Sequence, residues 1–96
     1  MNTINIRRSH GMTPKKARQA AERVAHELSE QFSFVYEWEG NILHFKRTGA
    51  VGRITVHKKD IELYVELNFL LGLMKSKIER EVHHYCDENF GPTPAT

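Results

Sequence analysis

The sequence predicts an α+β fold with the element order β-α-β-β-β-β-α, in which two helices pack on one face of an antiparallel sheet. Three observations support this prediction. Apolar residues recur every three or four positions within residues 13–30, alternate with polar ones over residues 34–69, and return to the helical period over residues 70–85. The 96 residues have the size of one domain, expected over residues 1–91, followed by a flexible C-terminal tail at residues 92–96.

The N-terminal segment predicts a short strand followed by a helix. Ile4 and Ile6 alternate with polar residues, and the strand is expected to end at residues 7–8. Thr13 is the expected N-cap of the helix, with Pro14 at the first helical position, where its missing N–H leaves no hydrogen bond unmade. The apolar stripe of the helix consists of Ala17, Ala20, Ala21, Val24, Ala25 and Leu28. This spacing predicts an amphipathic surface helix.

Residues 34–69 predict a meander of four antiparallel strands. The turns are expected at residues 40–41, 48–50 and 58–60, where glycine or charged residues interrupt the alternation. The residues expected to face the core are Phe34, Tyr36, Trp38, Leu43, Phe45, Ile54, Val56, Ile61, Leu63, Val65, Leu67 and Phe69. Because successive side chains of a strand point to opposite faces, the charged residues between them should cover a wet outer face. Gly52 is interpreted as a candidate for a β-bulge.

The last predicted element is a single helix. Its apolar arc consists of Leu70, Leu71, Met74, Ile78, Val82 and Tyr85. Ser76 and Glu79 have the spacing of a capping box, but the apolar repeat extends back to Leu70. The helix is therefore expected to begin near Leu71, with the box a coincidence. Leu73 falls outside the arc and should point toward solvent.

Composition indicates an ordinary globular protein of the cytoplasm. The net charge is +2, and charged residues make up 27% of the chain. A net positive charge this small does not indicate a polyanionic partner. Cys86 is the only cysteine, which excludes an intrachain disulfide and suits a reducing compartment. The N-terminus has no signal-peptide pattern, and the longest apolar-rich window, residues 63–74, is too short to span a bilayer.

No motif predicts catalysis, a cofactor or a metal site. His83 and His84 are adjacent, so on a helix they point about 100° apart, and His44 and His57 are expected in solvated cross-strand charge pairs. Cys86 precedes two acidic residues, which would raise the pKa of its thiol and disfavour a nucleophile. No glycine lies in a phosphate-binding frame. The sequence thus predicts a protein that is not an enzyme.

A cluster of cations near the N-terminus raises the alternative of nucleic-acid binding. Its members are Arg7, Arg8, Lys15, Lys16, Arg18 and Arg23. Binding to phosphates needs such a patch on one face, but the helical members scatter around the polar side of their helix. On the outer sheet face only Tyr64 would be an exposed aromatic residue, and Glu62 and Glu66 flank it. Nucleic acid is therefore not the expected partner.

Several short runs resemble a known family. They are Trp38-Glu39-Gly40, Leu43-His44-Phe45, Gly49, Gly52-Arg53-Ile54, residues 67–71 and Ile78-Glu79. Together they resemble the polyhydroxyalkanoic acid system family, short bacterial proteins encoded among polyhydroxyalkanoate synthesis and granule genes, over about residues 4–90. The resemblance implies a cytoplasmic protein linked to storage-polyester granules, and it carries over no catalytic residues. The element order also resembles a trimmed helix-grip domain, a fold that holds apolar ligands.

Two functional hypotheses follow. The first is an accessory, non-enzymatic module of polyester storage, with Phe69, Leu70 and Leu73 as an apolar ridge that contacts a second copy of the chain, a granule or a granule protein. The alternative is a small helix-grip-like domain that binds an apolar or hydroxyacyl ligand in a groove lined by Trp38, Phe45 and Phe69. A closed core with an exposed ridge would favour the first hypothesis, and an internal cavity would favour the second.

Overall fold

The computed structural model describes residues 2–91, so the expected tail at residues 92–96 lies outside the described residues. Its elements are β1 (Asn2–Ser9), α1 (Pro14–Phe32), β2 (Val35–Glu39), β3 (Ile42–Arg47), β4 (Ala50–Val56), β5 (Asp60–Leu67), α2 (Phe69–Gly72) and α3 (Lys75–Phe90). The α+β prediction is confirmed, and the order differs from it only where the last helix divides into α2 and α3.

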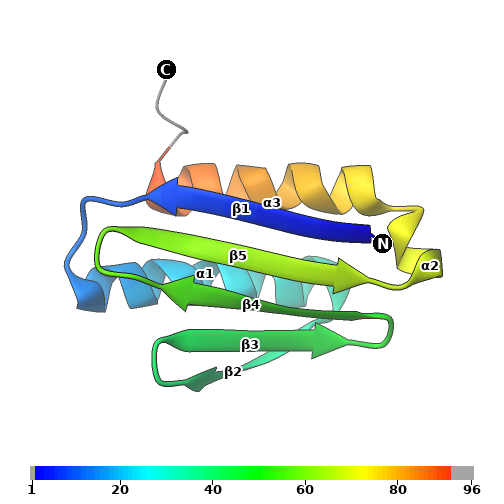
Figure 1. Ribbon diagram of the computed structural model, residues 1–96, viewed down its shortest axis with the longest axis horizontal. Helices are drawn as coiled ribbons and strands as arrows, with labels where there is room; N and C mark the ends of the chain where they lie inside the picture. Colours follow the sequence, from blue (N-terminus) through cyan, green and yellow to red (C-terminus); the bar gives the residue numbers. More distant parts are fainter. Residues whose placement is uncertain (1, 92–96) are drawn as a thin grey trace.

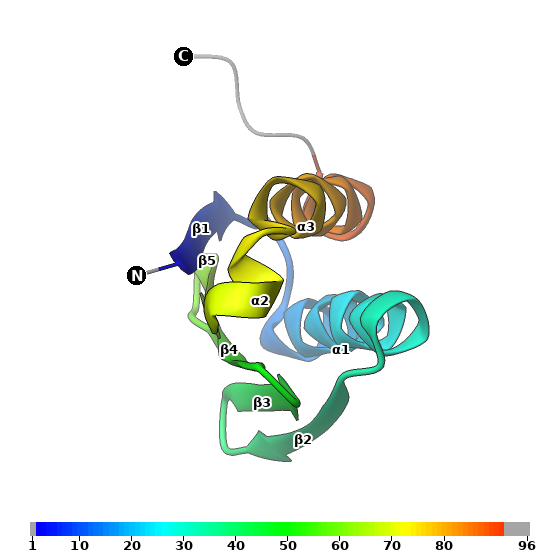
Figure 2. The same ribbon diagram turned by 90° about the vertical axis from the view of Figure 1, so that its right-hand side faces the viewer.

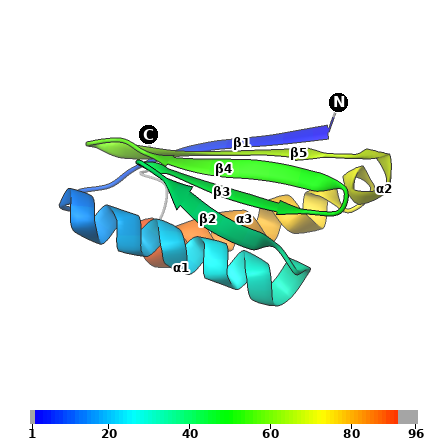
Figure 3. The same cartoon turned by 90° about the horizontal axis from the view of Figure 1, so that it is seen from below.

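The five strands form one antiparallel sheet in the order β1-β5-β4-β3-β2 (Figure 1). The strands after α1 follow one another as a meander, and β1 joins the sheet beside β5, far from it in sequence. Both long helices lie on one face, with α3 against β1 and α1 against β2, β3 and β4 (Figures 2 and 3). The opposite face carries no helix and is called the open face below.

Apolar and polar side chains alternate along the strands, and the apolar ones form the core as the sequence predicts. Ile4 pairs with Val65 and Ile6 with Leu63, so the inward residues of neighbouring strands stand side by side. The pairing continues without interruption through Gly52, which lies between Phe45 and Val65, so the interpretation of a bulge is wrong. A Cβ atom at Gly52 would lie 2.7 Å from the Phe45 ring, which shows that glycine is needed to make room for that ring.

Local signals explain where α1 begins and ends. The Thr13 side chain accepts a hydrogen bond from the Lys16 N–H at 3.3 Å, as an N-cap does, and Pro14 follows at the first helical position. At the other end Ser33 has a left-handed backbone (φ 62°), and its N–H donates to the Ser29 carbonyl. This conformation terminates a helix and turns the chain back toward β2.

The prediction of one C-terminal helix is wrong, because the chain breaks it at residues 73–74. Asn68 caps the short α2, and its side chain accepts from the Leu71 N–H at 2.9 Å. The Leu73 N–H then donates to the Leu70 carbonyl at 3.2 Å, a tight turn after which α3 begins at Lys75 with no side-chain cap. A Cβ atom at Gly72 would lie 1.9 Å from the Asn2 amide, so the start of β1 fills the space beside α2.

The same break moves Phe69 out of the core. The sequence predicts Phe69 as an inward residue at the end of the last strand, but β5 ends at Leu67 and Phe69 is the first residue of α2. Its side chain is 77% exposed. The prediction of an inward Phe69 is wrong, since the Asn68 cap ends the two-residue alternation before that position.

Candidate functional site: an apolar tip

The largest group of exposed apolar side chains lies on α2 and the turn that follows it. Phe69, Leu70, Leu73 and Met74 are 77%, 69%, 74% and 41% exposed, and together they are called the apolar tip. The sequence predicts the exposure of Leu73 but assigns Met74 to a buried arc, which the break between α2 and α3 makes wrong. Single exposed leucines are common, whereas four within six residues form a contiguous patch.

The apolar tip is held in place by contacts on its inner side. Leu71 is half-buried and packs against the core, so it anchors α2 while the neighbouring side chains point outward. The Asn68 N–H donates to the Gly49 carbonyl at 2.8 Å, which joins the start of α2 to the turn between β3 and β4. Figures 1 and 3 show α2 projecting at one end of the molecule, next to the start of β1. These contacts hold the tip at one end of the molecule.

The segment between Glu66 and Glu79 contains the apolar tip and carries charges of one sign. Residues 67–78 contain no aspartate or glutamate, and the only charged residues among them are Lys75 and Lys77. Lys75 is half-buried and Lys77 is exposed. Among the ion pairs formed within residues 2–91, none includes either lysine.

The three residues expected to line a ligand groove do not come together. Phe45 is 1% exposed and packs edge-to-face on Phe34, with ring centres 5.2 Å apart, so no free space surrounds it on the core side. Trp38 packs against the core from the inward face of the sheet, as expected, but it is only half-buried. Phe69 points outward in the apolar tip. None of the pockets described for residues 2–91 joins two of these three side chains.

Trp38 instead attaches the edge of the sheet to α1. The Arg18 guanidinium lies 4.0 Å from the centre of its ring, and its indole Nε1–H donates to the Glu22 carboxylate at 2.8 Å. Arg18 also donates to the Gly40 carbonyl at 2.6 Å, in the turn between β2 and β3. Trp38 is half-buried because β2 is an edge strand, with a neighbouring strand on only one side.

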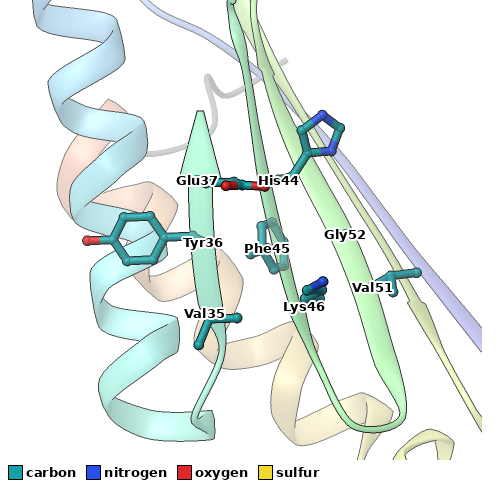
Figure 4. Close-up of a pocket in the computed structure, with 8 residues that line it drawn as sticks. All are labelled: Val35, Tyr36, Glu37, His44, Phe45, Lys46, Val51 and Gly52. Atoms are coloured by element: carbon teal, nitrogen blue, oxygen red, sulfur yellow. The ribbon is translucent and has the colours of Figure 1, made fainter. Parts of the chain in front are cut away.

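The open face carries a shallow hollow of about 440 Å³ (Figure 4). The residues that line it are Val35, Tyr36, Glu37, His44, Phe45, Lys46, Val51 and Gly52. Charged side chains dominate this face and pair across strands, as the sequence predicts. His44 Nε2 lies 3.0 Å from a Glu39 oxygen, and Arg7 lies 3.0 Å from Asp60. The pairs are exposed to water and stabilise the fold only weakly.

Three arginines of the N-terminal cluster, Arg8, Arg18 and Arg23, are engaged within the fold. Arg8 is 4% exposed and donates to Asp87 at 2.6 Å and to His83 Nδ1 at 2.9 Å. Arg18 stacks on Trp38, and Arg23 donates to the Asn89 side chain at 2.8 Å. These contacts point in different directions, so the cluster does not form one basic face of the kind that binds phosphates.

Cys86 lies in the core, where a thiolate is disfavoured. The pKa of its thiol is raised to about 11, mainly by burial, with Arg8 lowering it and Asp87 raising it. Within residues 2–91 no group of three or more histidine, cysteine, aspartate or glutamate side chains is arranged to hold a metal ion. None of the helices described combines the length and the apolar character needed to cross a bilayer.

Comparisons with known proteins agree with this fold and point to one family. The family model described as "Putative polyhydroxyalkanoic acid system protein" (PHA_gran_rgn) matches residues 4–90. The NMR structure of PA4090 from Pseudomonas aeruginosa is similar with a TM-score of 0.59, covering 92% of this chain and 83% of that chain at 8% sequence identity. At this identity the likeness concerns the fold alone. A comparison with curated proteins gives no match.

Proposed function

The chain belongs to the polyhydroxyalkanoic acid system protein family, and from this premise we propose that it is an accessory, non-enzymatic protein that attaches to polyester storage granules through its apolar tip. The exposure of Phe69, Leu70 and Leu73 carries this proposal. Contiguous apolar surface on a small protein marks a site of contact with another apolar surface, because leaving it in water is unfavourable.

The state of the core supports an accessory role over a ligand-binding role. Small-molecule sites are concave and enclose most of their ligand. Here Phe45 is closed in by Phe34, while Phe69 lies outside the core at the end of the molecule. The apolar surface that remains free is therefore exposed at the end of the molecule and does not enclose a ligand, which suits a broad surface better than a single hydroxyacyl ligand.

The size of the apolar tip supports a granule as the occupant over a second copy of the chain. A stable protein–protein interface takes about 20–30 residues from each partner. The tip spans only residues 69–74, and charged side chains that pair with one another cover the open face of the sheet. A few apolar side chains suffice to enter a soft apolar surface, since no matching partner surface has to be built.

The chemistry of the remaining side chains supports a role without catalysis. Catalysis requires charged groups preorganised around a reacting atom with water excluded. The histidines His44 and His57 instead lie on the wet open face beside Glu39 and Glu62, and Cys86 is buried as a thiol. A single buried cysteine suits a reducing compartment, so we infer a cytoplasmic location, where such granules would be met.

Granule co-sedimentation tests the proposal. The purified chain should sediment with isolated polyhydroxyalkanoate granules, and Leu73→Asp should remain in the supernatant, because a carboxylate on the tip must lose its water to enter an apolar surface. Val35→Asp is the matched control, since Val35 is 61% exposed on the edge strand β2. Both variants should keep the circular dichroism spectrum of the wild type.

Two results would contradict the proposal. One is a Leu73→Asp variant that binds granules as well as Val35→Asp does. The other is a shift from dimer to monomer caused by Leu73→Asp in sedimentation velocity, with granule binding unchanged, which would make the tip a contact between two copies.

A further inference from the structure

We propose that the apolar tip and the two lysines that follow it form a wedge for an anionic lipid layer, in which Phe69, Leu70 and Leu73 enter the acyl region and Lys75 and Lys77 contact the headgroup phosphates. This inference rests on the proposed function, because it names the chemistry of the surface that the tip meets. It commits to lipid headgroups rather than to bare polyester or to a protein groove.

Charge complementarity is the first argument. The twelve residues 67–78 hold the apolar tip, two lysines and no acid. A polyester chain has no net charge and offers these two ammonium groups no counterion. A lipid layer with anionic headgroups offers phosphates at the depth where side chains next to inserted apolar residues would lie.

The geometry of the lysines is the second argument. Lys75 and Lys77 lie in the first turn of α3, directly after Leu73 and Met74, so the charged and the apolar groups occupy one end of the molecule. Lysine has a long aliphatic stem, which can follow an apolar surface while its ammonium group stays at the polar boundary. Neither lysine is held in an ion pair within residues 2–91, so both are available.

The shape of the tip is the third argument. A groove that accepts a helix or a strand from a protein partner has walls, whereas Phe69, Leu70 and Leu73 are 77%, 69% and 74% exposed. Interfacial segments instead present apolar side chains outward with cations beside them. The break between α2 and α3 produces this arrangement, because it turns Phe69, Leu70, Leu73 and Met74 outward together.

Vesicle binding tests the inference. The full 96-residue chain is sedimented with phosphatidylcholine vesicles and with vesicles containing roughly 30% phosphatidylglycerol, at about 0.1 M and 0.5 M salt. We expect binding to the anionic vesicles alone, weakened at high salt. A lysine near an anionic surface contributes about a fivefold gain in affinity, so the double variant Lys75→Gln/Lys77→Gln should bind about 25-fold more weakly.

Matched variants separate the wedge from general attraction between charges. Lys58→Gln/Lys59→Gln removes two adjacent, exposed lysines from the turn between β4 and β5, at the other end of β5 from α2. It should bind anionic vesicles like the wild type, and Leu73→Asp should not bind them. Equal binding to both kinds of vesicle would overturn the inference, and so would an equal loss in the two lysine pairs.

The granule assay distinguishes this inference from the proposed function. If Leu73→Asp releases the protein from granules while Lys75→Gln/Lys77→Gln binds them like the wild type, the tip binds an uncharged surface and the lipid inference falls alone. If Leu73→Asp loses vesicle binding but keeps granule binding, the tip is a lipid wedge and the proposed attachment to granules falls alone.

Discussion

Cys86 illustrates how a single buried side chain responds to its surroundings. The thiol is fully buried, and burial raises its pKa from an ordinary value of 9.0 to about 11. The folded chain therefore holds the thiol proton more tightly than the unfolded chain does. The resulting stabilisation is fully present below pH 9 and is lost as the pH rises from 9 toward 11.

The pH dependence of unfolding checks this effect. Between pH 9 and 10 the free energy of unfolding of the wild type should fall by up to about 1.4 kcal/mol more than that of Cys86→Ala. Urea denaturation at pH 8, 9 and 10 measures the difference. The pKa of Tyr85 is raised as well, mainly by burial, but tyrosine begins from 10.0 and acts at higher pH. Parallel curves for the two proteins between pH 8 and 10 would show that the Cys86 pKa is not raised.

Arg8 has a structural role that could not be predicted from its residue type alone. By composition it belongs with the cations of the N-terminal cluster, but its position in β1 continues the inward alternation of Ile4 and Ile6. It reaches Asp87 and His83 on α3 and donates to the Gly91 carbonyl at 3.3 Å. Arg8 therefore joins the edge strand to the end of α3. Its spacing of two residues from Ile6 and four from Ile4, which places it on the inward side of β1, is the signal in the sequence that could have revealed this role.

At the scale of the elements, side chains of α1 hold the hairpin of β2 and β3. Its outer strand β2 has a strand neighbour on one side only, and Trp38 joins it to α1 through Arg18 and Glu22. Since the Trp38 side chain is half-buried, removing it should cost less than removing a core aromatic residue.

Two substitutions in this hairpin measure the difference. Trp38→Ala should lower the free energy of unfolding by about 1–2 kcal/mol, and Phe45→Ala by about 3–5 kcal/mol, since the second empties a fully enclosed site. Chemical denaturation of the two variants gives both values. An equal or larger loss for Trp38→Ala would show that Trp38 is a core residue, as the alternation alone predicts.

The break between α2 and α3 is the clearest difference between expectation and structure at the level of elements. The apolar repeat of residues 70–85 fits one helix, and the helical phase from Ile78 to Tyr85 is confirmed by their burial. Residues 69–74 depart from this single helix: Asn68 caps the separate α2, and Asn2 lies against Gly72. The second contact joins residues 70 positions apart, so no local repeat could have revealed it.

At the scale of the whole molecule, the layers place the apolar tip and Trp38 at opposite ends. The tip follows the end of β5, while Trp38 lies near the turn between β2 and β3, at the other end of the sheet in Figure 1. The molecule is a flattened body with extents of 37 × 32 × 22 Å, and the tip and Trp38 lie toward opposite ends of the sheet. Binding through the tip should therefore hold the molecule end-on, with Trp38 remaining in water.

Tryptophan fluorescence tests this orientation. Trp38 is the single tryptophan, so its emission should keep its wavelength when the wild type binds anionic vesicles. The variant Trp38→Phe/Leu73→Trp carries its tryptophan in the tip, and its emission should move to shorter wavelength as the indole leaves water. A shift of the wild-type emission of similar size would show that the chain lies flat on the surface or binds through another face.

The sequence by itself determined the element types, most of their order and the inward residues of the sheet, because helical and strand periods are local properties of the chain. It also indicated the family, through short runs between residues 38 and 79, and the family model matches residues 4–90. Tertiary structure decided the order of the strands, which put β2 at an edge and left Trp38 half-exposed, and it decided the burial of Arg8. It also divided the last helix, where Asn68 caps α2 and Asn2 lies against Gly72, and four apolar side chains of this segment are exposed to solvent.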